Sequence, residues 1–118
     1  MSGAPGDPAA IIAARLVQLW RASRPTILER LAVLRSAQTA LVADASDAEA
    51  RSNAREAAHK LSGVLGVFGL PQGSELAHNL EERLKTSDPL TAADLIAMAG
   101  EIESLEALIA AKGEGPDN

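Results

Sequence analysis

Apolar residues recur at spacings of three and four along almost the whole chain, and no segment alternates apolar with polar residues. The first pattern is typical of amphipathic helices and the second of half-buried strands, so the sequence predicts helices and no sheet. Proline, glycine and short polar clusters divide the pattern into segments. Five helices are expected: over about Pro8–Ala22, from after Pro25 to about Ala43, over about Ala48–Phe68, from Gln72 to about Thr86, and from the Thr91 cap to about residue 112.

The loops between the long segments are short, so consecutive helices have to run antiparallel. The expected fold is therefore all-α: an antiparallel up-down four-helix bundle with a short extra N-terminal helix. Residues 8–112 form a single domain in this interpretation, because 118 residues suffice for one compact domain and are too few for two. The Gly- and Pro-rich ends, residues 1–7 and 113–118, are expected to be flexible tails.

The composition narrows the function classes. The chain contains no cysteine, which excludes disulfides, thiolate metal sites and a cysteine nucleophile. Its net charge of −5 disfavours binding to nucleic acid and to anionic membrane surfaces. No apolar run approaches the ~18 residues that span a bilayer, and the first residues do not resemble a signal peptide. We therefore expect a cytoplasmic monomer that has no nucleic-acid or membrane partner.

The segment around His59 has an unusual helical wheel. At about 100° per residue, most of its apolar side chains share one arc of ~120°, which is expected to face the core. The residues of this arc are Ala54, Ala57, Ala58, Leu61, Val64, Leu65 and Phe68. His59 falls on the opposite side of the helix. Gly63 and Gly66 follow it there after one and two turns, and Arg55 precedes it by one turn.

The two glycines beside His59 require an explanation. Glycine inside a helix costs about 0.8–1 kcal/mol relative to alanine, and on the solvent side no close packing within the bundle requires it. Without Cβ atoms at these positions, a second protein can bring its backbone close to the imidazole. A neutral imidazole keeps a lone pair on one ring nitrogen, so it can accept a phosphoryl group and pass it on. Val67, near the same patch, is a candidate docking contact.

The run from Ala58 to Gly69 resembles the signature of the histidine-phosphotransfer (HPt) domain family. In that signature a histidine is followed by a leucine, a lysine, a glycine and a later glycine. The family's phosphoacceptor histidine corresponds to His59, its core leucine to Leu61 and its access glycine to Gly63. The next predicted helix of this chain is similar to the family's following helix as well.

This resemblance implies a function. The chain would be a phosphocarrier in a two-component phosphorelay that exchanges a phosphoryl group between His59 and an aspartate of a response-regulator receiver domain, and a hybrid histidine kinase would be a further partner. The Mg²⁺ ion would belong to the receiver, so no cofactor and no metal site are expected here. Because the sequence has no Gly-rich phosphate loop and no ATP-binding motif, the chain is not expected to be a kinase or another enzyme.

One position departs from the signature. The family usually has a lysine three residues after the histidine, where its ammonium group assists the phosphoryl group, and this chain has Ser62 there. Lys60 is basic and is kept among the candidate residues that support the phosphate or the partner, but it points about 100° away from His59 on the wheel and is a poor direct substitute for the usual lysine. Arg55 lies on the correct face, four residues before His59. We therefore predict that Arg55, or the hydroxyl group of Ser62, supports the phosphoryl group.

Two other function classes stay open. The bundle could dock on a receiver or a histidine kinase as a non-phosphorylated adaptor or inhibitor, an alternative that the Ser62 departure keeps open, or it could have a structural role unrelated to phosphotransfer. His78 has no glycine neighbours, and we interpret it as a solvated side chain. The charged residues of the same segment are interpreted as a solvated helix face with local ion pairs: Glu81, Glu82, Arg83 and Lys85.

Overall fold

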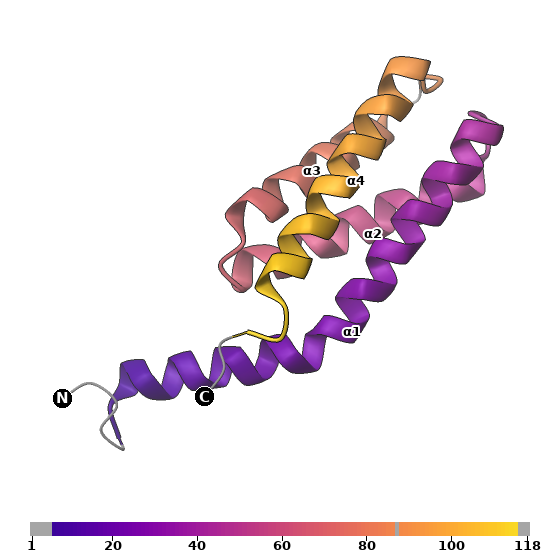
Figure 1. The fold of residues 1–118 in the computed structure, drawn as a ribbon. Coiled ribbons are helices and arrows are strands. Elements are labelled where there is room, and N and C mark those ends of the chain that lie inside the picture. The colour runs from indigo at the N-terminus through magenta and orange to yellow at the C-terminus, as the bar shows by residue number, and fades with distance from the viewer. Residues whose placement is uncertain (1–5, 87, 116–118) are drawn as a thin grey trace.

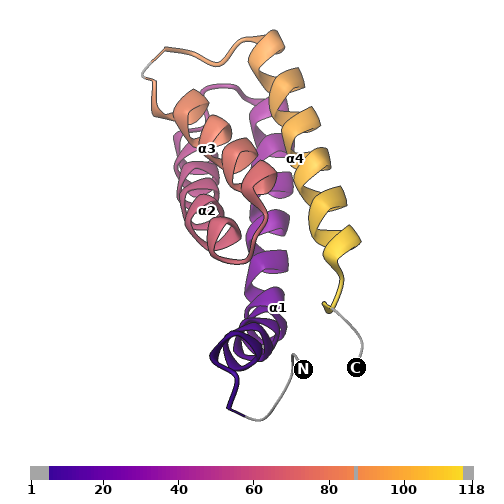
Figure 2. The same cartoon turned by 90° about the vertical axis from the view of Figure 1, so that its left-hand side faces the viewer.

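The structure is a computed structural model, and it describes residues 6–86 and 88–115. Its elements are four helices: α1 (Pro8–Ala43), α2 (Ala48–Val67), α3 (Pro71–Lys85) and α4 (Ala92–Lys112). The described residues contain no strand, as the sequence predicts. α1 packs against α2 and α4, and α3 packs against the same two helices. The helices therefore form the predicted up-down bundle (Figures 1 and 2).

The core of the bundle consists mainly of aliphatic side chains from all four helices. Its largest fully buried aliphatic members include Leu34, Leu41, Leu61, Leu65, Leu80, Met98, Ile102, Leu105 and Ile109. The predicted core face of α2 is buried at its alanines and leucines, while Val64 and Phe68 are partly buried at its edge. Full burial of one large aliphatic side chain contributes about 1.5–3 kcal/mol. This apolar face therefore fixes the rotation of α2 about its own axis, and with it the residues that project outward.

Local sequence signals set both ends of α2. The side chain of Asp47 caps its start by accepting a hydrogen bond from the backbone N–H of Ala50 at 3.0 Å. At the other end, Gly69 has a φ of 72°, a left-handed conformation that favours glycine. The N–H of Leu70 donates to the carbonyl oxygen of Leu65 at 3.0 Å, as in a Schellman motif. α2 begins and ends close to where the turn and proline signals predict.

The expected separate N-terminal helix is wrong, because residues 8–43 form a single helix with Pro25 inside it. An internal proline removes one backbone hydrogen bond and crowds the preceding turn, which bends a helix without having to end it. Pro25 is exposed, so its ring points away from the packed core. α1 accordingly changes direction between its two halves, and its N-terminal half extends beyond the other helices (Figure 1).

The N-terminal half of α1 leaves most of its apolar stripe exposed. Ile12, Leu16 and Leu19 have spacings of four and three, as core-facing residues do, yet all three are exposed. Trp20 is the point at which the stripe enters the core, since it is buried. The N-terminal half of α1 thus extends past the end of the bundle (Figure 1), while Leu16 lines a hollow together with Val67 of α2 and Lys112 of α4.

Trp20 also joins the chain's C-terminal residues to α1. Its indole N–H donates to the carbonyl oxygen of Gly113 at 2.8 Å, and its ring meets the ring of Phe68 edge-on at 5.3 Å between centroids. The described part of the expected C-terminal tail therefore contacts α1. The flexibility predicted for residues 1–5 and 116–118 concerns residues outside the described part of the chain.

Candidate functional site

The imidazole of His59 projects from α2 into solvent. Ala58, which precedes it, and Leu61, two residues later, are fully buried. These two contacts with the core hold α2 so that His59 lies on the outer side, which is where the helical wheel places it. The His59 side chain is 71% exposed. A partner protein can therefore reach the ring without any rearrangement of the bundle.

A carboxylate from the neighbouring helix fixes the orientation of this ring. Oε2 of Glu81, on α3, lies 2.9 Å from Nδ1 of His59. Because a carboxylate only accepts hydrogen bonds, the neutral ring donates through its Nδ1–H, and its lone pair remains on Nε2. A carboxylate at one ring nitrogen selects the tautomer and holds the ring in place. The geometry therefore presents Nε2 as the nucleophilic atom.

Glu81 itself is buried, with only 8% of its surface exposed, and it is the one charged residue buried to this extent among the described residues. Our interpretation of Glu81 as part of a solvated helix face is therefore wrong. Its neighbours along the buried side of α3 are Ala77, one turn earlier, and Leu84 and Leu80, which pack into the core. Glu81 lies one turn after a core alanine, so its position on the helical wheel of α3 could have predicted its burial.

Gly63 and Gly66 both leave the outer surface of α2 open. A Cβ atom at Gly63 would meet nothing within 4 Å, and one at Gly66 would meet only the side chain of Ser74, at 3.6 Å. Both glycines are exposed. The hydroxyl group of Ser74 donates to the backbone carbonyl oxygen of Ser62 at 2.7 Å, which joins α3 to α2 beside the site. Ser62 is partly buried at this junction and brings no charge to the site.

The three remaining predicted residues lie around His59 in different ways. Lys60 forms an ion pair with Glu56 at 2.8 Å on the outer surface of α2, and the Lys60 ammonium group holds the pKa of Glu56 below its usual value. Arg55 is exposed one turn before His59. Val67 is 64% exposed near the end of α2. The outer face of α2 thus carries a basic end, an open centre and an apolar end.

A further cation, Lys85, lies next to the site on α3. Nζ of Lys85 is 3.8 Å from Oε2 of Glu81 and 3.0 Å from Oε1 of Glu82. The hydrogen bond and the charge of Glu82 raise the pKa of Lys85, and the same hydrogen bond lowers the pKa of Glu82. The positive charge of Arg55, on α2, lowers the pKa values of both Glu82 and Lys85. Lys85 was not among the predicted site residues.

Comparison with known proteins identifies the family of this bundle. The family model of the Hpt domain matches residues 15–112, which is most of the chain. The chain belongs to the Hpt domain family. Hpt domains have a histidine-phosphotransfer role in two-component signalling, act as phosphocarriers rather than kinases, and interact with receiver domains and histidine kinases.

A similarity to a curated protein supports the same assignment. This Hpt domain is 30% identical to Protein RcaC of Microchaete diplosiphon over 77 residues, which are 65% of this chain and 12% of RcaC. The chain thus spans a small part of the length of that relative. No solved structure matches the chain significantly. None of the described helices combines the length and the apolar character that crossing a bilayer requires.

One group of side chains in the described residues of the Hpt domain has the composition of a metal site. His78, Glu81 and Glu82 each place one potential ligand atom within 4.8 Å of the others. These atoms already have partners, because Glu81 accepts the hydrogen bond from His59 and Glu82 pairs with Lys85. A metal ion here would have to displace both interactions.

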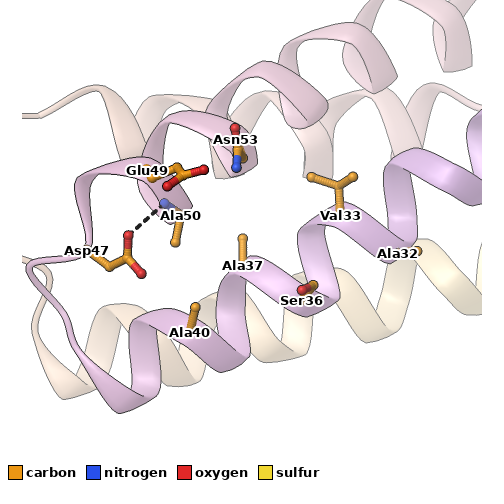
Figure 3. Close-up of a pocket in the computed structure, with 9 residues that line it drawn as sticks. All are labelled: Ala32, Val33, Ser36, Ala37, Ala40, Asp47, Glu49, Ala50 and Asn53. Carbon is orange, nitrogen blue, oxygen red and sulfur yellow. Dashed lines mark hydrogen bonds between the residues drawn. The ribbon is translucent and has the colours of Figure 1, made fainter.

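A concave surface on the Hpt domain lies between α1 and α2 (Figure 3). Its volume is about 450 Å³. It is lined by Ala32, Val33, Ser36, Ala37, Ala40, Asp47, Glu49, Ala50 and Asn53. None of the predicted site residues lines it, and the oxygen of Asp47 that is drawn there caps α2. This hollow is therefore separate from the candidate site on the outer surface of α2.

Proposed function

We propose that this Hpt domain exchanges a phosphoryl group between Nε2 of His59 and an aspartate of a receiver domain. The observation that carries the proposal is the anchored histidine: an imidazole that is 71% exposed and whose Nδ1 lies 2.9 Å from the buried carboxylate of Glu81. A solvent-facing histidine with no function would not require a buried carboxylate. A histidine that must present one particular nitrogen to a partner does.

The proposed chemistry uses the two ring nitrogens for different tasks. The lone pair on Nε2 attacks the phosphorus atom of an aspartyl phosphate, a new N–P bond forms, and the O–P bond to the aspartate breaks, so that the aspartate leaves as a carboxylate. The positive charge that develops on the ring is held by the Nδ1–H···Glu81 hydrogen bond. The same steps in reverse order transfer the phosphoryl group from Nε2 to the aspartate of a second receiver.

The remaining contribution comes from the partner. Phosphoryl transfer depends on positioning and on charge stabilisation more than on covalent participation by the protein. We propose that the receiver holds the Mg²⁺ ion that neutralises the phosphoryl oxygens and that the Hpt domain needs no cofactor of its own. The open surface at Gly63, with no atom within 4 Å of an added Cβ, supports a close approach of the partner backbone.

The partners and the setting follow from this exchange. We propose a hybrid histidine kinase as the source of the phosphoryl group, which originates from ATP and so places the exchange in the cytoplasm. We also propose that the domain works as a monomer, because the core is closed by four helices of one chain.

The test is phosphotransfer from a receiver domain that has been labelled on its aspartate. The Hpt domain should acquire an acid-labile, alkali-stable label. The variant His59→Gln should acquire none, and His78→Gln, the matched control at the second histidine of the chain, should be labelled like the wild type. Binding to the receiver without transfer of the label would contradict the carrier function and support the adaptor or inhibitor function instead.

A further inference from the structure

We propose that Lys85 supplies the positive charge that stabilises the phosphorylated form of His59, an inference that rests on the proposed function. A phosphoryl group brings about −1.5 to −2 charges at neutral pH. Here it would be added to a ring that already contacts the carboxylate of Glu81. Two anionic groups on opposite nitrogens of one ring repel each other unless a cation lies close to both.

Lys85 meets the first part of this requirement, because it lies close to Glu81. Its Nζ lies 3.8 Å from Oε2 of Glu81, the same oxygen that accepts the hydrogen bond from Nδ1 of His59. The ammonium group and the ring are thus separated by a single oxygen atom. Lys85 ends α3, and its side chain is 42% exposed. A lysine has a flexible four-carbon stem, so its ammonium group can move toward a newly attached phosphoryl group.

The second partner of Lys85 keeps the lysine close without holding it tightly. Glu82 contacts Nζ at 3.0 Å, but its side chain is half exposed. Exposed ion pairs contribute little free energy because water screens them. The exchange of Glu82 for a doubly charged phosphoryl group is therefore favourable, while Glu81 can remain in contact with the imidazole throughout.

The other basic residues on this surface are connected to His59 less directly. Lys60 is paired with Glu56. His78 lies 3.9 Å from Glu82 and not from the oxygen that contacts the imidazole. Arg55 acts on the Glu82–Lys85 pair through its charge. The position three residues after His59 holds the uncharged Ser62, so the ammonium group of Lys85 on the adjacent helix provides the positive charge that this position lacks.

A partner-free assay isolates this contribution. The intact protein carrying His78→Gln, in which His59 is the remaining histidine, is labelled with phosphoramidate; the N–P bond of that reagent breaks, ammonia leaves, and an N–P bond to the imidazole forms. The decay of the phosphohistidine is then followed by ³¹P NMR in the presence of a chelator. In this background, Lys85→Gln should shorten the half-life by about three- to fivefold, an effect of the size expected for exposed charges.

Matched variants separate a charge effect from a structural one. Lys60→Gln removes the same charge from a lysine that is 46% exposed and also pairs with a glutamate, and it should leave the half-life unchanged. Lys85→Arg should restore the half-life, and added salt should reduce the difference between Lys85→Gln and its parent. The ring tautomer of unphosphorylated His59, read by ¹⁵N NMR, should be the same in all variants.

Two results would overturn the inference. One is a Lys85→Gln protein whose phosphohistidine decays at the rate of Lys60→Gln. The other is a changed His59 tautomer in Lys85→Gln before phosphorylation, which would mean that the lysine acts only by positioning Glu81. Failure of the proposed function is a separate outcome: the parent protein would be labelled by phosphoramidate and would not exchange label with any receiver.

Discussion

A substitution at Gly63 tests two properties: the stability of the fold and the access of a partner to His59. The residue lies inside α2, is exposed, and has open space where a Cβ atom would lie. An alanine would therefore lose no packing and meet no clash, so the change should reflect helix propensity alone. Gly63→Ala should raise the free energy of unfolding by about 0.8–1 kcal/mol. For a domain of this size, that is an increase in Tm of about 4 °C.

Gly100 provides the matched control. It lies inside α4, is exposed, and likewise has nothing within 4 Å of an added Cβ atom. Gly100→Ala should therefore stabilise the fold by the same amount. Only Gly63→Ala should slow phosphotransfer from a receiver, on the order of tenfold, because the added methyl group lies where the partner backbone has to approach.

Urea unfolding followed by circular dichroism measures the first effect, and the rate of label transfer measures the second. A Gly63→Ala protein that is less stable than the wild type would refute the open environment assigned to this position. Equal transfer rates for the two alanine variants would refute the placement of Gly63 in the docking surface, whatever the stabilities prove to be.

Three further predictions concern other parts of the fold. Glu81→Ala removes the charged partner of the imidazole, a bond worth about 1.5–3 kcal/mol, and should slow phosphotransfer at least tenfold in a labelling assay while the circular dichroism spectrum stays helical. Gly73→Ala places a Cβ atom 3.1 Å from Cδ1 of Leu65, which has to shift by a few tenths of an ångström; in urea titrations it should therefore stabilise the fold by less than the ~0.8–1 kcal/mol expected for Gly63→Ala. The pKa of Asp94 is lowered, chiefly by its backbone hydrogen bond with Thr91. The stability that the ionised carboxylate gives to the fold is therefore present above the usual aspartate pKa and is lost as the pH falls through the lowered value. Asp94→Asn should reduce the loss of folding stability between about pH 5 and pH 2.

The helical pattern was sufficient to predict the bundle and the outward position of His59. Both follow from the spacing of apolar residues, which records the face that each helix buries. Glu81 was missed because charged residues are rarely buried unless paired, and its charged neighbours suggested a solvated surface. The partner that makes its burial favourable belongs to another helix, and a pattern read along one segment does not contain that contact.

Pro25 shows a second limit of the pattern. A proline indicates a helix boundary because it removes a backbone donor and restricts the residue before it. Whether it ends a helix or only bends it depends on the packing on both sides. Here Ile27 and Trp20 are both buried on the core side of α1, while Pro25 is exposed. Tertiary contacts therefore keep the helix continuous through a position where local preference favours a break.

The buried indole gives the molecule a natural optical reporter. The sequence contains one tryptophan and no tyrosine, so its intrinsic fluorescence arises almost entirely from Trp20. That ring contacts Phe68 at the end of the histidine-bearing helix, and the ammonium group of Lys112 lies 5.1 Å from its centre. Emission from the unlabelled protein would therefore follow, in real time, any loosening of the junction between α1, the end of α2 and the C-terminal residues.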